Sequence, residues 1–412
     1  MMKQAYKVKA LFDGQAPKLR ERVILLTEKG RVVDILPWEA EESLKAAQTE
    51  LHDESDLYAM PGLIDGHVHL MLPGDGTAAE DVITRSPGEI QISAAKNAQQ
   101  ALEHGITTLR DCGGWPNIVF DLRRAIERGL IAGPDLLLCG SALTCTGGHA
   151  WTMGGEVDTV DELVKRVRLE HKQGADFVKM IATGGGTKNV LQHGIMLSQE
   201  QLNAGVTEAH RLGVYATAHV CTTATGRMAV AAGVDMIEHL LFADAANHLD
   251  FDPALAEEIA RRGITVCHTM SVLPLSVARY DSLGRALTPA EQGEYDMLQR
   301  FNEVIFEGFS RTCDMIDYIP GTDAGWRRSP FGSLLDGMLV MAQLGMSNGR
   351  VLVSATGLAA RVLGIAERAG VLAPGQQADF LLLRENPLAD LHALRRPEAV
   401  YKKGVRSLLR VQ

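Results

Sequence analysis

The chain has 412 residues, of which 46% are hydrophobic, with 41 glycines and a formal net charge of −10. This length fits one large domain with an appendage or two medium domains, and the composition is typical of a globular α/β protein. The negative charge argues against nucleic acid or an anionic membrane as a partner, and no apolar run reaches transmembrane length. The N-terminus lacks the apolar core of a signal peptide, and the six cysteines form no CxxC pair. We therefore expect a cytoplasmic protein with reduced cysteines.

The two ends of the chain have the character of β-strands. Runs rich in β-branched and apolar residues occur at 6–11, 22–26 and 31–36, and the turn at 28–30 predicts a hairpin between the last two. Similar runs follow at 377–383 and 399–403. We expect residues 1–60 and 366–412 to pair into one small β-sandwich domain that flanks a central body of residues 61–365.

In the central body, short apolar runs alternate with helical patterns. Strand candidates lie at 63–66, 105–111, 134–140, 176–182, 214–220, 236–240, 264–269 and 318–323, and helix candidates include 160–173, 198–212 and 253–262. Ser198 followed by Gln201 is a capping-box pattern at a helix start. Eight such units over about 300 residues predict a (β/α)₈ TIM barrel. A doubly wound open sheet is the alternative, although no GxGxxG follows the first strand.

Chemically capable side chains stand at the carboxyl ends of these strands, where a barrel of this kind builds its active site. His67 and His69 are two apart, so on a strand they would project to the same side as a ready pair of metal ligands. A lysine within an apolar strand is costly to bury as a cation and needs a special reason. The strand-end set is His67, His69, Lys179, His219, His239 and Asp323. A single strand histidine is more often an ordinary core residue, but four histidines, a lysine and an aspartate gathered at five strand ends favour a metal site.

Four motifs carry a resemblance to a known family. They are PGLIDGHVHL (61–70), TGGHAWTMGGEVD (146–158), GADFVKMIATGG (174–185) and GVDMIEHL (233–240). As a set they resemble the metal-dependent amidohydrolase superfamily, in the branch of imidazolonepropionase-related enzymes and Xaa-Pro dipeptidases. The resemblance runs over essentially the whole chain and implies two divalent metal ions, expected to be zinc. It implies that His67, His69 and Asp323 bind one ion, that His219 and His239 bind the other, and that a carboxylated Lys179 bridges them.

The resemblance also implies a reaction. Two close metal ions would lower the pKa of a bridging water to give hydroxide, with Asp323 as the general base and then the general acid toward the leaving nitrogen. His149, on the glycine-rich loop after strand three, is the candidate donor to the scissile carbonyl or anchor for a carboxylate. We therefore expect hydrolysis of a C–N bond in a small molecule, namely an amide in a dipeptide or N-acyl amino acid. A catalytically dead metal-binding scaffold has little support because all six ligand positions are filled.

One departure from the family pattern keeps an alternative open. Peptidase members often carry a tyrosine two residues after the strand-five histidine, whereas this chain has Cys221, a weaker donor or a small packing residue. The alternative substrates are a cyclic amide, as in an imidazolonepropionase, a carbamate, or an aryl urea or xenobiotic amide. His268 and Arg327 are further candidates for substrate contact, the arginine for a carboxylate. Residues 281–315 are long for a barrel connection and are expected to form a helical cover or an oligomer contact, because members of this family commonly self-associate.

Overall fold

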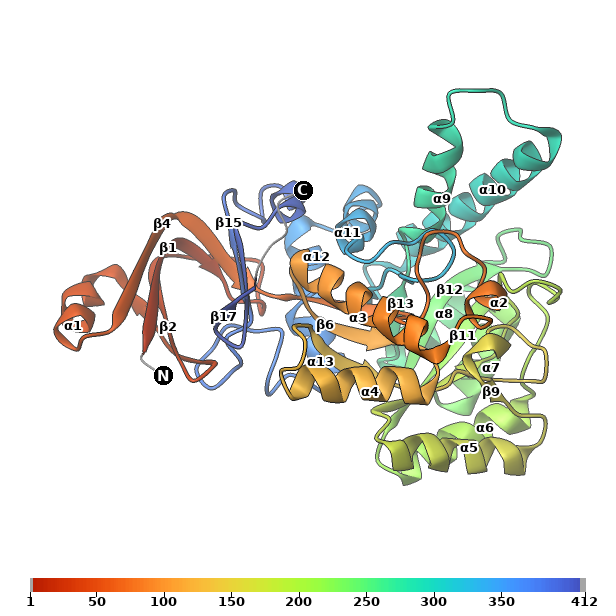
Figure 1. Cartoon of the computed structure of the whole chain (residues 1–412). Coiled ribbons are helices and arrows are strands. Elements are labelled where there is room, and N and C mark those ends of the chain that lie inside the picture. Colours follow the sequence, from red (N-terminus) through yellow and green to blue (C-terminus); the bar gives the residue numbers. More distant parts are fainter. Residues whose placement is uncertain (1–2, 408–412) are drawn as a thin grey trace.

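The computed structural model describes residues 3–407, without the side chain of Leu273. It is a mixed α/β protein with a β-rich end and a larger body of strands and helices (Figure 1). The ends of the predicted flanking segments, residues 1–2 and 408–412, lie outside the described residues. Within the described part, no helix has both the length and the apolar content that crossing a membrane requires.

The β-rich end is a seven-stranded sheet that both ends of the chain build, in the order β17-β16-β15-β4-β1-β2-β3. β2 and β3 form the predicted antiparallel hairpin, and β15 runs antiparallel to β4 with Phe380 opposite Pro61. Tyr6, Phe380 and Tyr401 form the centre of its core, where the last two rings stack with centroids 4.3 Å apart. The bounds are β1 (Gln4–Phe12), β2 (Leu19–Glu28), β3 (Arg31–Pro37), α1 (Glu41–Ala46), β4 (Glu50–Pro61), β15 (Phe380–Leu383), β16 (Ala399–Lys402) and β17 (Val405–Arg406).

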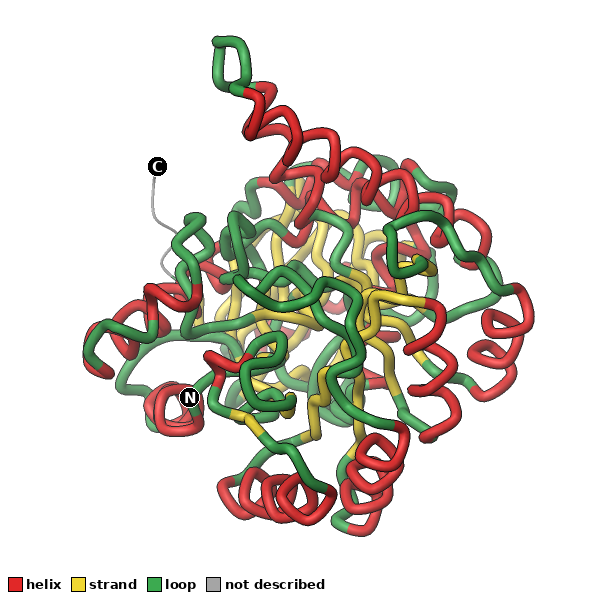
Figure 2. The backbone as a smooth tube through the Cα atoms, turned by 90° about the vertical axis from the view of Figure 1, so that its right-hand side faces the viewer, coloured by secondary structure: helices red, strands yellow, loops and turns green. Residues whose placement is uncertain are grey.

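The body contains parallel strands with helices around them (Figure 2). β5 (Leu63–Val68), β6 (Ile106–Asp111) and β7 (Asp135–Leu138) form one sheet. The other sheet has the order β14-β13-β12-β11-β10-β8-β9. Its bounds are β8 (Leu143–Thr144), β9 (Gly155–Glu156), β10 (Phe177–Ile181), β11 (Tyr215–Thr222), β12 (Met236–Ala243), β13 (Thr265–His268) and β14 (Tyr318–Pro320).

Backbone hydrogen bonds link the edges of these two sheets. Asp176, just before β10, donates its N–H to the Leu138 carbonyl of β7 over 2.7 Å. On the other side, Asp323 donates its N–H to the His67 carbonyl over 2.8 Å, so the segment after β14 lies beside β5. The carboxyl ends of strands that are distant in sequence therefore meet at one face of the body.

Helices cover the strands from outside. They are α2 (Ala79–Val82), α3 (Pro87–Glu103), α4 (Pro116–Glu127), α5 (Val160–Gln173), α6 (Gln199–Arg211), α7 (Thr223–Ala232), α8 (Pro253–Arg262), α9 (Val272–Asp281), α10 (Pro289–Thr312), α11 (Leu334–Gln343), α12 (Asn348–Ser354) and α13 (Gly357–Val362). The predicted capping box at the start of α6 is present, since Ser198 accepts from the Gln201 N–H. α9 and α10 project beyond the other helices as a hairpin (Figure 1).

Candidate active site

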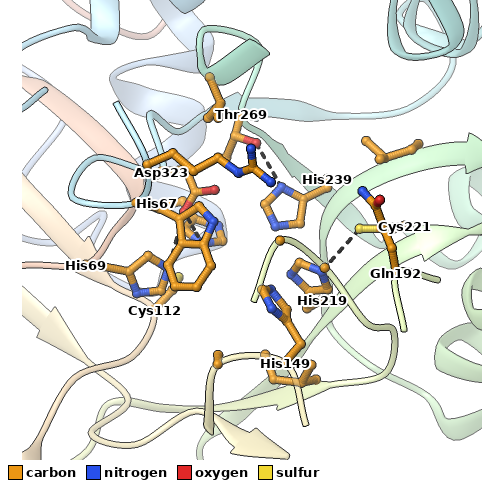
Figure 3. Close-up of a pocket in the computed structure, with 18 of the residues that line it drawn as sticks. His67, His69, Cys112, His149, Gln192, His219, Cys221, His239, Thr269 and Asp323 are labelled. Atoms are coloured by element: carbon orange, nitrogen blue, oxygen red, sulfur yellow. Dashed lines mark hydrogen bonds and ion pairs between the residues drawn. The ribbon is translucent and has the colours of Figure 1, made fainter. Parts of the chain in front are cut away.

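Five histidines and one aspartate of the predicted site line one cavity at the carboxyl ends of the parallel strands, together with His193, which was not predicted (Figure 3). They are His67, His69, His149, His219, His239 and Asp323, and the predicted Lys179 also lines this cavity. Neighbouring rings are close, with centroids 5.3 Å apart for His67 and His69 and 4.5 Å apart for His219 and His239. The structure therefore brings all six predicted metal ligands to one place.

Hydrogen bonds hold the rings of His67 and His69 so that one nitrogen of each is left for the cavity. His67 Nδ1 donates to a carboxylate oxygen of Glu238 over 2.8 Å, and His69 Nδ1 donates to the Gly113 carbonyl over 2.9 Å. These bonds place the free lone pair on Nε2, which is the usual arrangement around metal-binding histidines. Burial lowers the pKa of His67 and His239 to about 3, so both rings are neutral and able to ligate at pH 7.

Asp323 lies between the first two histidines. Its Oδ1 is 3.5 Å from His67 Nε2 and 3.2 Å from His69 Nε2. Burial alone would raise the pKa of Asp323, but His67 and His69 outweigh that effect and hold the carboxyl well below its usual range. Its backbone adopts a left-handed φ of 53°, and His239 has a φ of 71°. Such backbone conformations in residues other than glycine are uncommon and concentrate at functional sites.

Behind His67 lies a buried charged pair that sequence reasoning missed. Glu238 and Arg110 are both fully buried, and the guanidinium donates to Glu238 Oε1 over 2.8 Å. Thr217 Oγ1 donates to the same carboxylate oxygen over 2.6 Å. Arg110 also stacks on the ring of Phe177, 4.2 Å from its centroid. Glu238 therefore accepts hydrogen bonds from Arg110 with one carboxylate oxygen and from His67, a residue of the cavity, with the other.

Lys179 lacks the partner that a buried ammonium normally requires. Its side chain is 2% exposed on β10. Among residues 3–407, no hydrogen bond or ion pair to its amine is present. An unpaired charge is expensive to bury, so this amine is a candidate for chemical modification or for a role with bound ligands.

The donor set fits a divalent cation. His67, His239 and Asp323 offer ligand atoms within 4.8 Å of one another. His67, Glu238 and Cys267 form a second such group, but the Glu238 charge is already compensated by Arg110. Neutral imidazoles with one carboxylate suit zinc and related transition metals. Another predicted ligand, His219, lies beside His239 and adds a further imidazole to this group of possible metal ligands.

Comparison with known proteins agrees with this geometry. Residues 58–406 match the amidohydrolase family. The chain belongs to the amidohydrolase family. Ochratoxinase from Aspergillus niger is 27% identical over 421 residues, which cover 95% of this chain and 83% of that protein. Imidazolonepropionase from Deinococcus deserti is 22% identical over 393 residues, covering 87% of this chain and 85% of the relative.

Solved structures share the fold of this amidohydrolase. A crystal structure of a Xaa-Pro dipeptidase with bound methionine superposes with a TM-score of 0.83 at 24% identity, covering 98% of this chain and 99% of that chain. The predicted family resemblance and the α/β class are confirmed, and the protein is a hydrolase that acts on carbon–nitrogen bonds. Its family generally uses a divalent metal centre, in agreement with the ligand group above.

His149 is held against the cavity by the loop after β10. Its Nδ1 lies 2.7 Å from Thr187 Oγ1, which also accepts from the Ala150 N–H over 3.0 Å. The Thr187 hydroxyl can therefore donate its proton to His149 Nδ1. The neutral His149 ring would then carry its own proton on Nε2, which makes Nε2–H a hydrogen-bond donor. A Cβ on Gly185 would approach the His149 ring to 2.5 Å, so only glycine permits this close packing. Burial lowers the pKa of His149 to about 3, so the ring is neutral.

Arg327 lines the cavity and, unlike its neighbour Arg328, has a free guanidinium. Among the described residues, no hydrogen bond or ion pair to the Arg327 side chain is present, whereas Arg328 donates to the Asp75 carbonyl over 2.9 Å. The guanidinium lies against Gly186, where a Cβ would approach it to 2.6 Å. An unpaired guanidinium at a cavity wall is well suited to bind a carboxylate.

The other two predicted contact residues differ in placement. Cys221 lines the cavity, and its Sγ is 3.2 Å from His219 Nε2. His268 is buried behind the wall between Phe309 and Tyr318, and neither ring nitrogen has a hydrogen-bond partner within the part of the chain that the structure describes. It is not among the described residues that line the cavity, so the prediction that His268 contacts substrate gains no support.

If Lys179 is carboxylated, the modification should be detectable directly. Protein reconstituted with metal and isotope-labelled bicarbonate should show one carbamate resonance by carbon NMR. The Lys179 amine would add labelled CO2 to form a carbamate, an anion that the bound metal ions would stabilise. Lys179→Met should lack the resonance and bind less metal by elemental analysis. Lys172→Met, at an exposed lysine of α5, is the control and should keep both signals. Wild-type protein that binds metal fully without the resonance would contradict the modification.

Proposed function

We propose that this amidohydrolase is a binuclear metal-dependent enzyme that cleaves an amide bond in a dipeptide or N-acyl amino acid. The observation that carries the proposal is the convergence of four buried histidines, Asp323 and an unpaired Lys179 on one cavity. His67, His69 and Asp323 would hold one ion, His219 and His239 the other, and a carboxylated Lys179 would bridge them. Zinc is the expected metal. Bound divalent cations supply Lewis acidity for the scissile carbonyl and for the attacking water.

The side chains of the cavity have complementary roles in this reaction. Asp323 would accept a proton from the attacking water and deliver it to the leaving nitrogen. His149 would donate a hydrogen bond to the oxygen of the scissile carbonyl as negative charge develops there. Arg327 would bind the carboxylate of the amino-acid part, which is supported by its free guanidinium on the cavity wall.

Cys221 favours a second candidate function. A thiol beside His219 is smaller and donates more weakly than the tyrosine that peptidases of this branch often carry. This supports hydrolysis of a cyclic amide, a carbamate, or an aryl urea or xenobiotic amide as the alternative.

A hydrolysis screen separates these functions. Metal-loaded protein would be tested against dipeptides and N-acyl amino acids, and in parallel against carbamates, aryl ureas and cyclic amides. The proposal is supported if the first group is hydrolysed and Arg327→Met lowers kcat/KM by about tenfold or more while Arg328→Met does not. A loss of about tenfold is what removing one hydrogen bond to a charged group typically causes. Activity confined to the second group would overturn the peptidase-like function.

We also propose the architecture and setting that the family resemblance implies. A (β/α)₈ barrel over residues 61–365 is supported by the backbone hydrogen bonds that join the residue before β10 to β7 and the segment after β14 to β5. A small β-sandwich domain of residues 1–60 and 366–412 is supported by the antiparallel pairing of β15 with β4, which joins the two ends of the chain. A cytoplasmic location is supported by the unpaired state of all six cysteines. A homo-oligomer is supported by the projecting α9–α10 hairpin.

A further inference from the structure

The helical hairpin between β13 and β14 forms part of the cavity wall. Four residues of α10 line the cavity, namely Met297, Leu298, Phe301 and Ile305. Their spacing places them on one face of the helix. The hairpin has a small core of its own, in which Leu298 packs with Val277 and Tyr280. The long segment between these strands is therefore fixed in place and contributes directly to the substrate cavity.

This wall is apolar. Every α10 residue that lines the cavity is hydrophobic, and the adjoining wall residues Leu241 of β12 and Val272 of α9 are hydrophobic as well. Leu298, Phe301 and Ile305 are buried, so their side chains are already packed in position. A preformed apolar wall favours a ligand that presents an apolar group to it, because burial removes both surfaces from water.

The charged groups of the cavity come from other elements. Arg327 follows β14 and is held beside the loop of Gly186, while α10 packs over β12, where Gly308 lies next to Phe242. Lys179 lies within β10, and Asp323 lies in the segment after β14. A substrate whose carboxylate binds Arg327 and whose amide carbonyl lies at the histidines would therefore direct its remaining group toward the apolar wall.

We propose that the acyl group of the substrate is bulky and apolar, aromatic or branched, and that it binds against Met297, Leu298, Phe301 and Ile305. This inference rests on the proposed amide hydrolysis and names its substrate class more closely. An acetyl group would make few contacts with this wall and gain little binding, whereas a benzoyl group would pack against it. Phe301 is the residue to test, because it stands between Leu298 and Ile305 on the lining face of α10; the ring of His193, which also lines the cavity, lies 5.7 Å from its ring between centroids.

The test compares two acyl groups on one amino acid, chosen as the best substrate of the screen. We expect wild-type kcat/KM for the N-benzoyl compound to exceed that for the N-acetyl compound by roughly tenfold or more, as apolar pockets discriminate by about 10–200-fold. Phe301→Ala should reduce this ratio by about tenfold. Val304→Ala, a buried position of α10 that does not line the cavity, is the matched control and should keep the ratio. The inference would be overturned if wild type had the same kcat/KM for both compounds, or if Phe301→Ala lowered kcat/KM for both compounds by the same factor.

A binding measurement keeps the inference separate from the proposed function. Calorimetric titration of metal-loaded protein with benzoate and with acetate compares the same carboxylate with and without the ring. Benzoate should bind at least tenfold more tightly, and Phe301→Ala should remove most of the difference. Tight benzoate binding without amide cleavage would keep the apolar pocket and reject the amide substrate. Amide cleavage with no preference in either assay would reject the pocket and keep the hydrolase.

Discussion

Replacing Asp323 with Asn should lower kcat by about 10²–10⁴-fold, the usual loss when a general acid–base group is removed. The amide has almost the same size as the carboxylate and keeps one oxygen near His67 and His69, so the fold and much of the metal binding should survive. It cannot, however, take up a proton from water and deliver it to a leaving nitrogen. The rate of the best substrate, the metal content and the melting temperature of the variant together check this expectation.

The control for this variant is Asp75→Asn. Asp75 lies in the loop after β5, and its carboxylate accepts from the Thr77 N–H outside the cavity. This substitution should leave kcat within about twofold of wild type, as is usual for a surface position. An Asp323→Asn variant that retains more than about one tenth of the rate would contradict the acid–base role, because such roles contribute at least 10²-fold.

The position of the site was predictable because local sequence rules and topology agreed. α5 and α8 begin and end where their patterns predicted, and the capping box at Ser198 marks the start of α6. Since parallel strands present their carboxyl ends at one face, residues such as His67, His219 and Asp323 had to converge once the strands were recognised. The proposed chemistry then followed from the residue types at that face.

Other features depend on contacts that no local pattern contains. β4 is rich in acidic residues at its start, such as Glu50 and Asp53, and it is a strand because it pairs in parallel with β1. Glu238 was visible only as a strand residue before a histidine, because its partner Arg110 lies 128 positions away. His268 occupies a strand end like the ligands, but its ring turns toward Phe309 and Tyr318. The twofold period of a strand does not identify which face reaches the cavity.

Replacing Glu238 with Gln should lower the free energy of unfolding by about 3–5 kcal/mol, the range found when one partner of a buried ion pair is removed. Arg110 is fully buried and donates to Glu238 Oε1, so the variant leaves its cation without a compensating charge. Burial would raise the pKa of Glu238, but Arg110 outweighs that effect, so the group is ionised at neutral pH. Urea unfolding of the metal-free protein measures the loss. Glu258→Gln is the control, because Glu258 pairs with two arginines on the exposed face of α8 and should leave the unfolding midpoint almost unchanged.

A double variant separates the structural role of Glu238 from its role at the cavity. Combining Glu238→Gln with Arg110→Met removes the uncompensated cation and should recover much of the lost stability, since the unpaired buried charge is what makes breaking such a pair costly. It should not recover metal affinity, because His67 Nδ1 still lacks the carboxylate that fixes its orientation. Loss of such a partner typically weakens metal binding by about 10–100-fold. A double variant that regains both stability and metal affinity would show that Glu238 serves only to neutralise Arg110. A stable double variant that binds metal weakly would identify Glu238 as the residue that positions His67.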